Sequence, residues 1–68
     1  MTECCLKNKV QQYRLSAGLT QVELAEAVNV TRQTIISIEK ENYIPSVLLA
    51  LRLSRVLKLS VEELFFEV

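Results

Sequence analysis

The sequence has no histidine and no aspartate, so it lacks two of the side chains that enzymes use most as acids, bases and metal ligands. Glycine occurs once, which excludes a glycine-rich phosphate-binding loop. No nucleophile stands beside a base in the pattern that covalent catalysis requires. The acidic residues are all glutamates, and helix capping and solvated helix faces account for them. We therefore expect no enzymatic activity and no cofactor.

Cysteine is also scarce, since only Cys4 and Cys5 occur, side by side near the start of the chain. Two interpretations compete. Either the pair senses redox state or binds a soft metal, or it consists of two unpaired thiols in a loose tail over residues 1–6. A tetrahedral metal site needs four ligands, and the chain has no histidine or further cysteine to supply them. The second interpretation is favoured, and we expect no metal site.

Long apolar runs are missing too. No segment has the length that a membrane-spanning helix needs, and no positively charged start precedes an apolar signal core. A chain of 68 residues with one proline and one glycine has room for a single small domain, residues 1–68, with short loops. We expect a cytoplasmic protein with no membrane partner and no separate domain for a small-molecule effector.

The net charge is zero, because eight lysines and arginines balance eight glutamates. Many nucleic-acid-binding proteins are basic, since neutralising phosphates releases counterions and supplies most of the non-specific affinity. The charges are nevertheless segregated: Arg32 and Lys40 lie in the middle of the chain, whereas Glu62, Glu63 and Glu67 follow near its end. This distribution leaves a DNA-binding role open, and it predicts weak non-specific binding by a monomer.

The most informative segment is residues 19–39, which reads as two short amphipathic helices joined by a tight turn. Thr20 and Glu23 have the spacing of a capping box at the start of the first of these helices. Leu24, Ala25 and Val28 then recur on one face at helical spacing. The chain must reverse at the residue that follows, Asn29. Asparagine tolerates the left-handed backbone of such a turn better than other non-glycine residues.

The second helix of this pair begins after Thr31, a favoured N-cap residue. Ile35 and Ile38 fall on its inward face. The polar residues of its other face are left for solvent or a ligand: Arg32, Gln33, Thr34 and Ser37. Two such helices with a polar outer face on the second are the layout of a DNA-binding helix-turn-helix.

The rest of the chain predicts three more helices. The first spans residues 7–17, with Val10, Tyr13 and Ala17 towards the core, and Gly18 ends it. A connecting loop over residues 40–45 precedes a leucine-rich helix that Ser46 caps and that runs to about residue 57. Ser60 and Glu63 form a second capping box for a brief fifth helix, and residues 66–68 favour an extended backbone.

These segments resemble the Cro/repressor-type (XRE) helix-turn-helix family, from about Lys7 to Phe66. The resemblance rests on the ordered motifs 19–21, 24–25, 30–35, 38–39, 43–46 and 60–65. It implies an all-α, compact five-helix, lambda-repressor-like domain with a short C-terminal strand. The family usually has glycine where this chain has Asn29 and near Glu41. Glutamate accepts a positive φ less readily than asparagine.

The resemblance implies that the second helix of the motif lies in the major groove of DNA. Arg32, Gln33 and Ser37 then take the base-contacting positions, with arginine suited to guanine and glutamine to adenine. The residues expected to contact phosphates are Gln21, Thr31, Thr34, Lys40, Asn42 and Tyr43. In this family the positions of Arg14 and Glu39 often form a partly buried ion pair between the first and third helices. Both are expected to be structural here.

Three apolar residues stand where the family commonly has polar ones: Ile36, Leu48 and Phe66. Ile36 either meets a thymine methyl group or covers Ile44 or Leu48 in a surface patch, and we favour the patch. Contiguous exposed apolar surface on a small protein usually marks an interface.

A homodimer is expected because one motif contacts few base pairs and a neutral monomer gains little from phosphates. Phe65 is expected to pack inward. Phe66 and Val68 would share one face of an extended dimerisation tail over residues 66–68 and pair with their symmetry mates. The competing interpretation is a frayed chain end. A two-fold dimer would read a near-palindromic duplex.

The sequence therefore predicts a sequence-specific, double-stranded DNA-binding transcriptional regulator, of the repressing kind, that works as a homodimer. The alternative is a DNA-anchoring antitoxin or a protein-interaction module on the same fold. High apolar content and zero net charge favour that alternative. An antitoxin normally carries an additional segment for its toxin, which argues against it.

Overall fold

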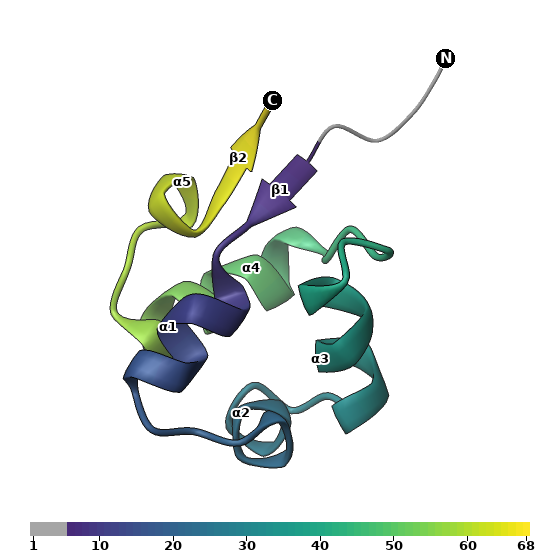
Figure 1. The fold of residues 1–68 in the computed structure, drawn as a ribbon, viewed down its shortest axis with the longest axis vertical. Coiled ribbons are helices and arrows are strands. Elements are labelled where there is room, and N and C mark those ends of the chain that lie inside the picture. Colours follow the sequence, from purple (N-terminus) through teal and green to yellow (C-terminus); the bar gives the residue numbers. More distant parts are fainter. Residues whose placement is uncertain (1–5) are drawn as a thin grey trace.

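The computed structural model describes residues 6–68, and within that range the chain forms five helices and two short strands (Figure 1). In chain order they are β1 (Leu6–Asn8), α1 (Val10–Ser16), α2 (Gln21–Ala27), α3 (Arg32–Glu39), α4 (Val47–Leu57), α5 (Val61–Leu64) and β2 (Phe65–Glu67). The five expected helices are confirmed. The expectations about Cys4 and Cys5 concern residues outside the described range.

Side-chain caps decide where four of the helices begin. At α2, the Thr20 hydroxyl accepts from the Glu23 N–H at 3.0 Å, and the Glu23 carboxylate accepts from the Thr20 N–H at 2.8 Å. The same reciprocal box joins Ser60 and Glu63 at α5. Single caps start the other two, from Thr31 at α3 and Ser46 at α4. Each cap supplies a partner for an N–H that the helix leaves unpaired.

The core forms where the apolar faces of the helices meet. Its fully enclosed side chains come from all five helices and from the residue that follows α2: Val10, Leu24, Val28, Ile35, Ile38, Leu53 and Leu64. Burying one such side chain contributes about 1.5–3 kcal/mol. Phe65 is also buried, as expected. Ala17 is exposed, so its expected place in the core is wrong. The helix has ended by then, and Ala17 lies in the turn that Gly18 completes.

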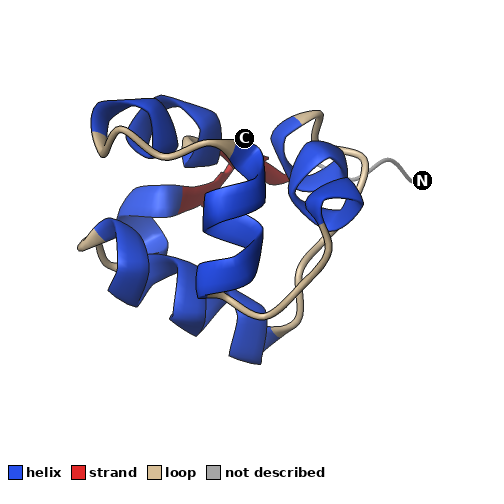
Figure 2. Cartoon of the chain, turned by 90° about the horizontal axis from the view of Figure 1, so that it is seen from below, coloured by secondary structure: helices blue, strands red, loops and turns tan. Residues whose placement is uncertain are grey.

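The first helix begins at Val10 and not at Lys7, because the preceding residues form β1. Leu6 therefore belongs to a strand and not to a loose tail. β1 pairs with β2 in antiparallel register, and Lys7 lies opposite Phe66. The expected extended end of the chain is thus a strand that pairs within the chain. Figure 2 shows the two strands together beside the helices.

Positive φ angles occur at both positions where the resemblance led us to expect glycine. Asn29 and Glu41 each have a φ of 63°. The backbone after Lys40 keeps the left-handed turn although a glutamate occupies it. Glu41 also makes two contacts with the first strand: its carboxylate accepts from Lys7 Nζ at 3.1 Å and from the Asn8 N–H at 3.4 Å. These contacts offset part of the strain of a non-glycine residue in this region.

Candidate nucleic-acid interface

The turn between α2 and α3 fixes the angle at which the two helices meet. After α2 ends, Asn29 adopts the left-handed conformation and the Val30 N–H returns to the Ala25 carbonyl at 2.9 Å. Thr31 then starts α3. Leu24 of α2 and Val28, which follows it, pack in one core with Ile35 and Ile38 of α3. The result is a helix-turn-helix with a polar outer face on α3.

The outer face of α3 presents two long polar side chains at its first turn. Arg32 and Gln33 are exposed, while Ser37, one turn later, is half-buried. Among residues 6–68, Arg32 and Gln33 make no side-chain hydrogen bond or ion pair, so their donors remain available to a ligand. All three proposed base-contacting residues lie on α3, outside its buried face of Ile35 and Ile38.

The residues expected to contact phosphates lie around the same helix. Gln21 is the first residue of α2, and its Nε2 donates to Glu39 Oε1 at 3.1 Å. An amide nitrogen carries two hydrogens, so one donor remains. The Thr31 and Thr34 hydroxyls lie 3.1 Å apart at the start of α3. Exposed residues follow α3 at its other end: Lys40, Asn42 and Tyr43.

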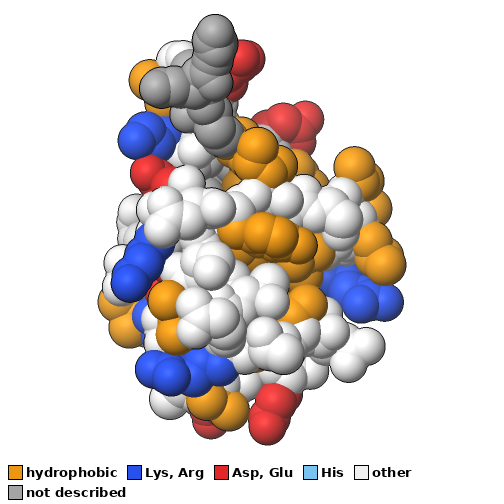
Figure 3. Space-filling view, turned by 90° about the vertical axis from the view of Figure 1, so that its right-hand side faces the viewer, with side chains coloured by type: hydrophobic (Ala, Val, Ile, Leu, Met, Phe, Trp, Pro, Cys, Tyr) orange, Lys and Arg blue, Asp and Glu red, His pale blue; other side chains and the backbone are white. Residues whose placement is uncertain are grey.

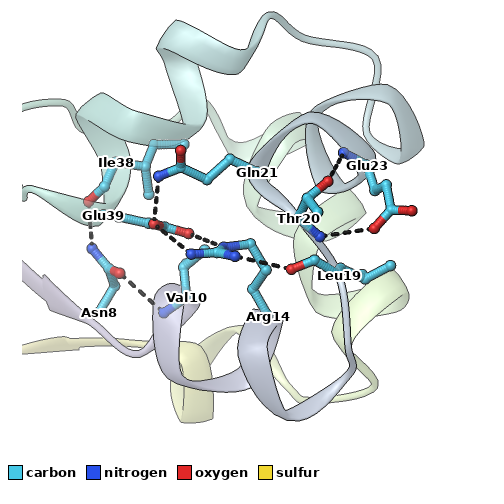
Figure 4. A network of polar contacts seen from close by, with 9 residues as sticks. All are labelled: Asn8, Val10, Arg14, Leu19, Thr20, Gln21, Glu23, Ile38 and Glu39. Atoms are coloured by element: carbon cyan, nitrogen blue, oxygen red, sulfur yellow. Dashed lines mark hydrogen bonds and ion pairs between the residues drawn. The ribbon is translucent and has the colours of Figure 1, made fainter.

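A buried polar network holds α1, α2 and α3 together beneath this face (Figure 4). Arg14 Nε lies 2.6 Å from Glu39 Oε2, and its Nη2 donates to Oε1 of the same carboxylate at 3.3 Å. The third guanidinium nitrogen donates to the Leu19 carbonyl at 2.9 Å. With Gln21 on the same carboxylate, Glu39 links the end of α3 to two other helices. The two-pronged geometry fixes orientation as well as distance.

Sequence reasoning missed Asn8, which it placed inside a helix. Its Nδ2 donates to the Ile38 carbonyl at 2.9 Å, and its Oδ1 accepts from the Val10 N–H at 3.0 Å. Asn8 therefore accepts from the first N–H of α1, two residues on, and donates to a carbonyl near the end of α3. The signal that was available is the tendency of asparagine side chains to hydrogen-bond the backbone two residues further on.

A second kind of surface adjoins the end of α3. Five large apolar side chains are exposed along the α3–α4 connection and the first turns of α4: Tyr43, Ile44, Val47, Leu48 and Leu51. We call them the apolar patch. Figure 3 shows hydrophobic side chains gathered on the face that carries this connection. Phe66 and Val68, the expected dimer residues, lie in and just after β2, and the structure does not bring them to the face of α3.

Two other features are absent from residues 6–68. No helix there is long and apolar enough to cross a membrane. The same residues contain no group of three or more histidine, cysteine or acidic side chains that could hold a metal ion.

The known sequences that are similar to this chain are helix-turn-helix proteins. A helix-turn-helix family model matches residues 10–64. An HTH-type transcriptional regulator of Bacillus subtilis, YgzD, is 44% identical over 61 residues, which cover 90% of this chain and 92% of that protein. An HTH-type transcriptional regulator of Methanothermobacter thermautotrophicus is 48% identical over 61 residues, which cover 88% of each chain.

Solved structures give the same result. The N-terminal DNA-binding domain of SinR from Bacillus subtilis is similar with a TM-score of 0.73 and 34% identity, covering 79% of this chain and 80% of that chain. A chain of the SinR–SinI protein complex gives a TM-score of 0.74 and 34% identity over 79% of this chain. The match covers 53% of that chain, so the protein spans about half of its length.

Proposed function

The chain belongs to the helix-turn-helix family of transcriptional regulators, and from this premise we propose that it is a sequence-specific repressor that reads duplex DNA. We propose residues 1–68 as a single DNA-binding domain. The observation that carries the proposal is the outer face of α3, where Arg32 and Gln33 stand exposed at the first turn without partners among residues 6–68.

In this proposal α3 enters the major groove and its first turn reads bases. Arg32 donates two hydrogen bonds to a guanine, and Gln33 pairs with an adenine edge. Ser37 reaches a third base directly or through water. Each good two-pronged contact contributes about 1–3 kcal/mol of discrimination against a wrong base. The buried network around Glu39 supports this role because it holds the helix that carries these side chains.

Phosphate contacts would position the helix without reading sequence. Gln21 opens α2, where unpaired N–H groups and the helix dipole attract an anion. Lys40 is the exposed cation at the end of α3. The remaining proposed phosphate contacts are Thr31, Thr34, Asn42 and Tyr43. Because the net charge of the chain is zero, the attraction between one copy and the DNA phosphates is small. One copy alone is therefore expected to bind DNA weakly.

A homodimer would supply the missing affinity. β1 covers one edge of β2, and no other strand of residues 6–68 lies at the second edge. A symmetry mate pairing there would extend the sheet, with the exposed side chains of Phe66 and Val68 at the contact. Two recognition helices about 34 Å apart would read a near-palindrome. A dimer bound across a promoter blocks polymerase, which is why we propose repression.

The experiment that tests this function is selection of bound sequences from random duplexes. The intact chain is incubated with the pool, and recovered sequences are compared with the input. A near-palindromic motif with half-sites one helical turn apart is the expected result. Recovered pools that match the input would exclude sequence-specific binding.

The second candidate function is a protein-interaction module or a DNA-anchoring antitoxin. The apolar patch favours it, since the five side chains are all more than 40% exposed on one small molecule. One similar chain, SinR, is in a complex with another protein, SinI. Co-expression with the products of neighbouring genes would separate the two functions. A toxin neutralised by this chain would establish the second.

A further inference from the structure

A surface pocket lies between the turn that follows α2 and the second half of α4. It has a volume of about 380 Å³, at the small end of the range of about 300–1,000 Å³ for ligand sites. The end of α2 and the following turn form one wall, and the second half of α4 forms the other. The lining residues are Ala27, Val28, Asn29, Arg52, Arg55 and Val56. We call it the arginine pocket.

The charges of this pocket are not compensated within the described chain. Arg52 is half-buried and Arg55 is exposed, and neither forms a hydrogen bond or an ion pair with any of residues 6–68. Two other cations have ion-pair partners, since Lys7 lies 3.1 Å from Glu41 Oε1 and Arg14 binds Glu39, whereas Arg32 and Lys40 have none among residues 6–68.

The spacing of the two arginines adds to this imbalance. Residues three apart on a helix are neighbours on its surface, so Arg52 and Arg55 repel each other. A bound anion between them would relieve that repulsion.

The walls of the pocket indicate which anion fits. Arginine presents a planar fork that matches a carboxylate with two parallel hydrogen bonds. Ala27 and the half-buried Val56 place apolar surface beside the two guanidinium groups, over the buried Val28. A glutamate or aspartate next to an apolar side chain matches both features, whereas a hydrated DNA phosphate offers nothing for the apolar wall. None of the residues proposed to contact DNA lines the pocket.

We propose that the arginine pocket is a docking site for an acidic, partly apolar segment of a partner protein. The segment places a carboxylate between Arg52 and Arg55 and an apolar side chain against Val56. The site is separate from the base-reading face of α3 and from the outer edge of β2. It therefore adds a protein partner to the proposed DNA-binding function and does not depend on that function.

The test begins with a displayed library of random short peptides selected on the intact chain. We expect recovered peptides to be enriched in glutamate or aspartate beside apolar residues. Their affinity should fall about tenfold or more for the Arg52→Gln/Arg55→Gln double variant, because charge-assisted hydrogen bonds are lost. Lys58→Gln removes an exposed cation outside the pocket and is the matched control. It should leave affinity unchanged.

Three results would overturn the proposal. One is a library without acidic enrichment, and another is equal peptide binding by the parent and the double variant. The third is a loss of DNA affinity with a flatter salt dependence in the double variant, which would make the pocket a phosphate site. Thermal denaturation checks that the variants fold. Peptide-induced amide shifts in the parent chain, expected at Asn29 and Val56, provide a readout that needs no variant.

Discussion

Arg14 Nε and Glu39 Oε2 lie 2.6 Å apart, with the two side chains only 8% and 4% exposed. This pair joins the middle of α1 to the last residue of α3 across the base of the proposed recognition surface. Burying two charges costs desolvation free energy that their attraction repays only with good geometry and further hydrogen bonds. Leu19 and Gln21 supply those further bonds. The pair therefore orients α3 more than it adds net stability.

The first prediction concerns this pair. Arg14→Met and Glu39→Leu should each lower the free energy of unfolding by about 3–5 kcal/mol, because each leaves one buried charge without its partner. The double replacement should be less destabilising than either single change. Urea denaturation of the four proteins gives the coupling free energy. Additive losses would mean that the two residues do not interact.

DNA-binding measurements can distinguish the proposed roles of Arg32 and Lys40. Arg32→Ala should weaken the preferred site by about 1–3 kcal/mol and relax specificity at one base pair. Lys40→Ala should weaken all duplexes about equally and reduce the slope of affinity against salt concentration by about one phosphate contact. Titrations on the selected site and on random duplex, at several salt concentrations, measure both. Identical effects of the two changes would contradict the assigned roles.

Lys58 carries a strained backbone that glycine would relieve. It follows α4 with a φ of 62° and a ψ of 43°. Lys58→Gly should raise the free energy of unfolding by about 1 kcal/mol, since the left-handed conformation costs an L-residue about 1–2 kcal/mol and glycine loses part of the gain to chain entropy. Lys58→Ala keeps the strain and is the control in thermal unfolding. An equal gain from alanine would show that the lysine charge was responsible.

Dimerisation can be tested at the end of β2. Truncation after Phe65 would also remove backbone pairing with β1, so a substitution is the cleaner change. Val68→Lys should shift the chain towards monomer in sedimentation, because it places a charge at the proposed apolar contact. Leu15→Lys, at an exposed position of α1, is the matched control and should leave the dimer intact. A parent chain that sediments as a monomer at concentrations where it binds DNA excludes this dimer.

The sequence predicts the helices of this protein well because their signals are local. Thr20 and Glu23, and likewise Ser60 and Glu63, are three residues apart and cap the helix that they begin. The ion pair between Arg14 and Glu39 is also present as expected, but that expectation came from the family resemblance. No local pattern pairs residues this far apart.

What the sequence did not reveal depends on contacts between distant segments. Leu6–Asn8 forms a strand because Phe65–Glu67 lies beside it, and three residues alone carry no such signal. The same applies to Glu41, whose positive φ is tolerated beside side chains of the first strand. The arginine pocket depends on α2 and α4 coming together, which spacing within either helix does not indicate.

The pairing of β1 with β2 has a consequence for how the chain folds. Its two strands are separated by nearly the whole chain, so closing them costs more loop entropy than any turn between neighbouring helices. The helix-turn-helix is built from contacts close in sequence, which form fast. We therefore expect the β1–β2 pair to be the last part of the fold to form. Asn8 binds the Ile38 carbonyl and Lys7 pairs with Glu41 just after α3, so we expect α3 to reach its final position only when the two ends of the described chain have met.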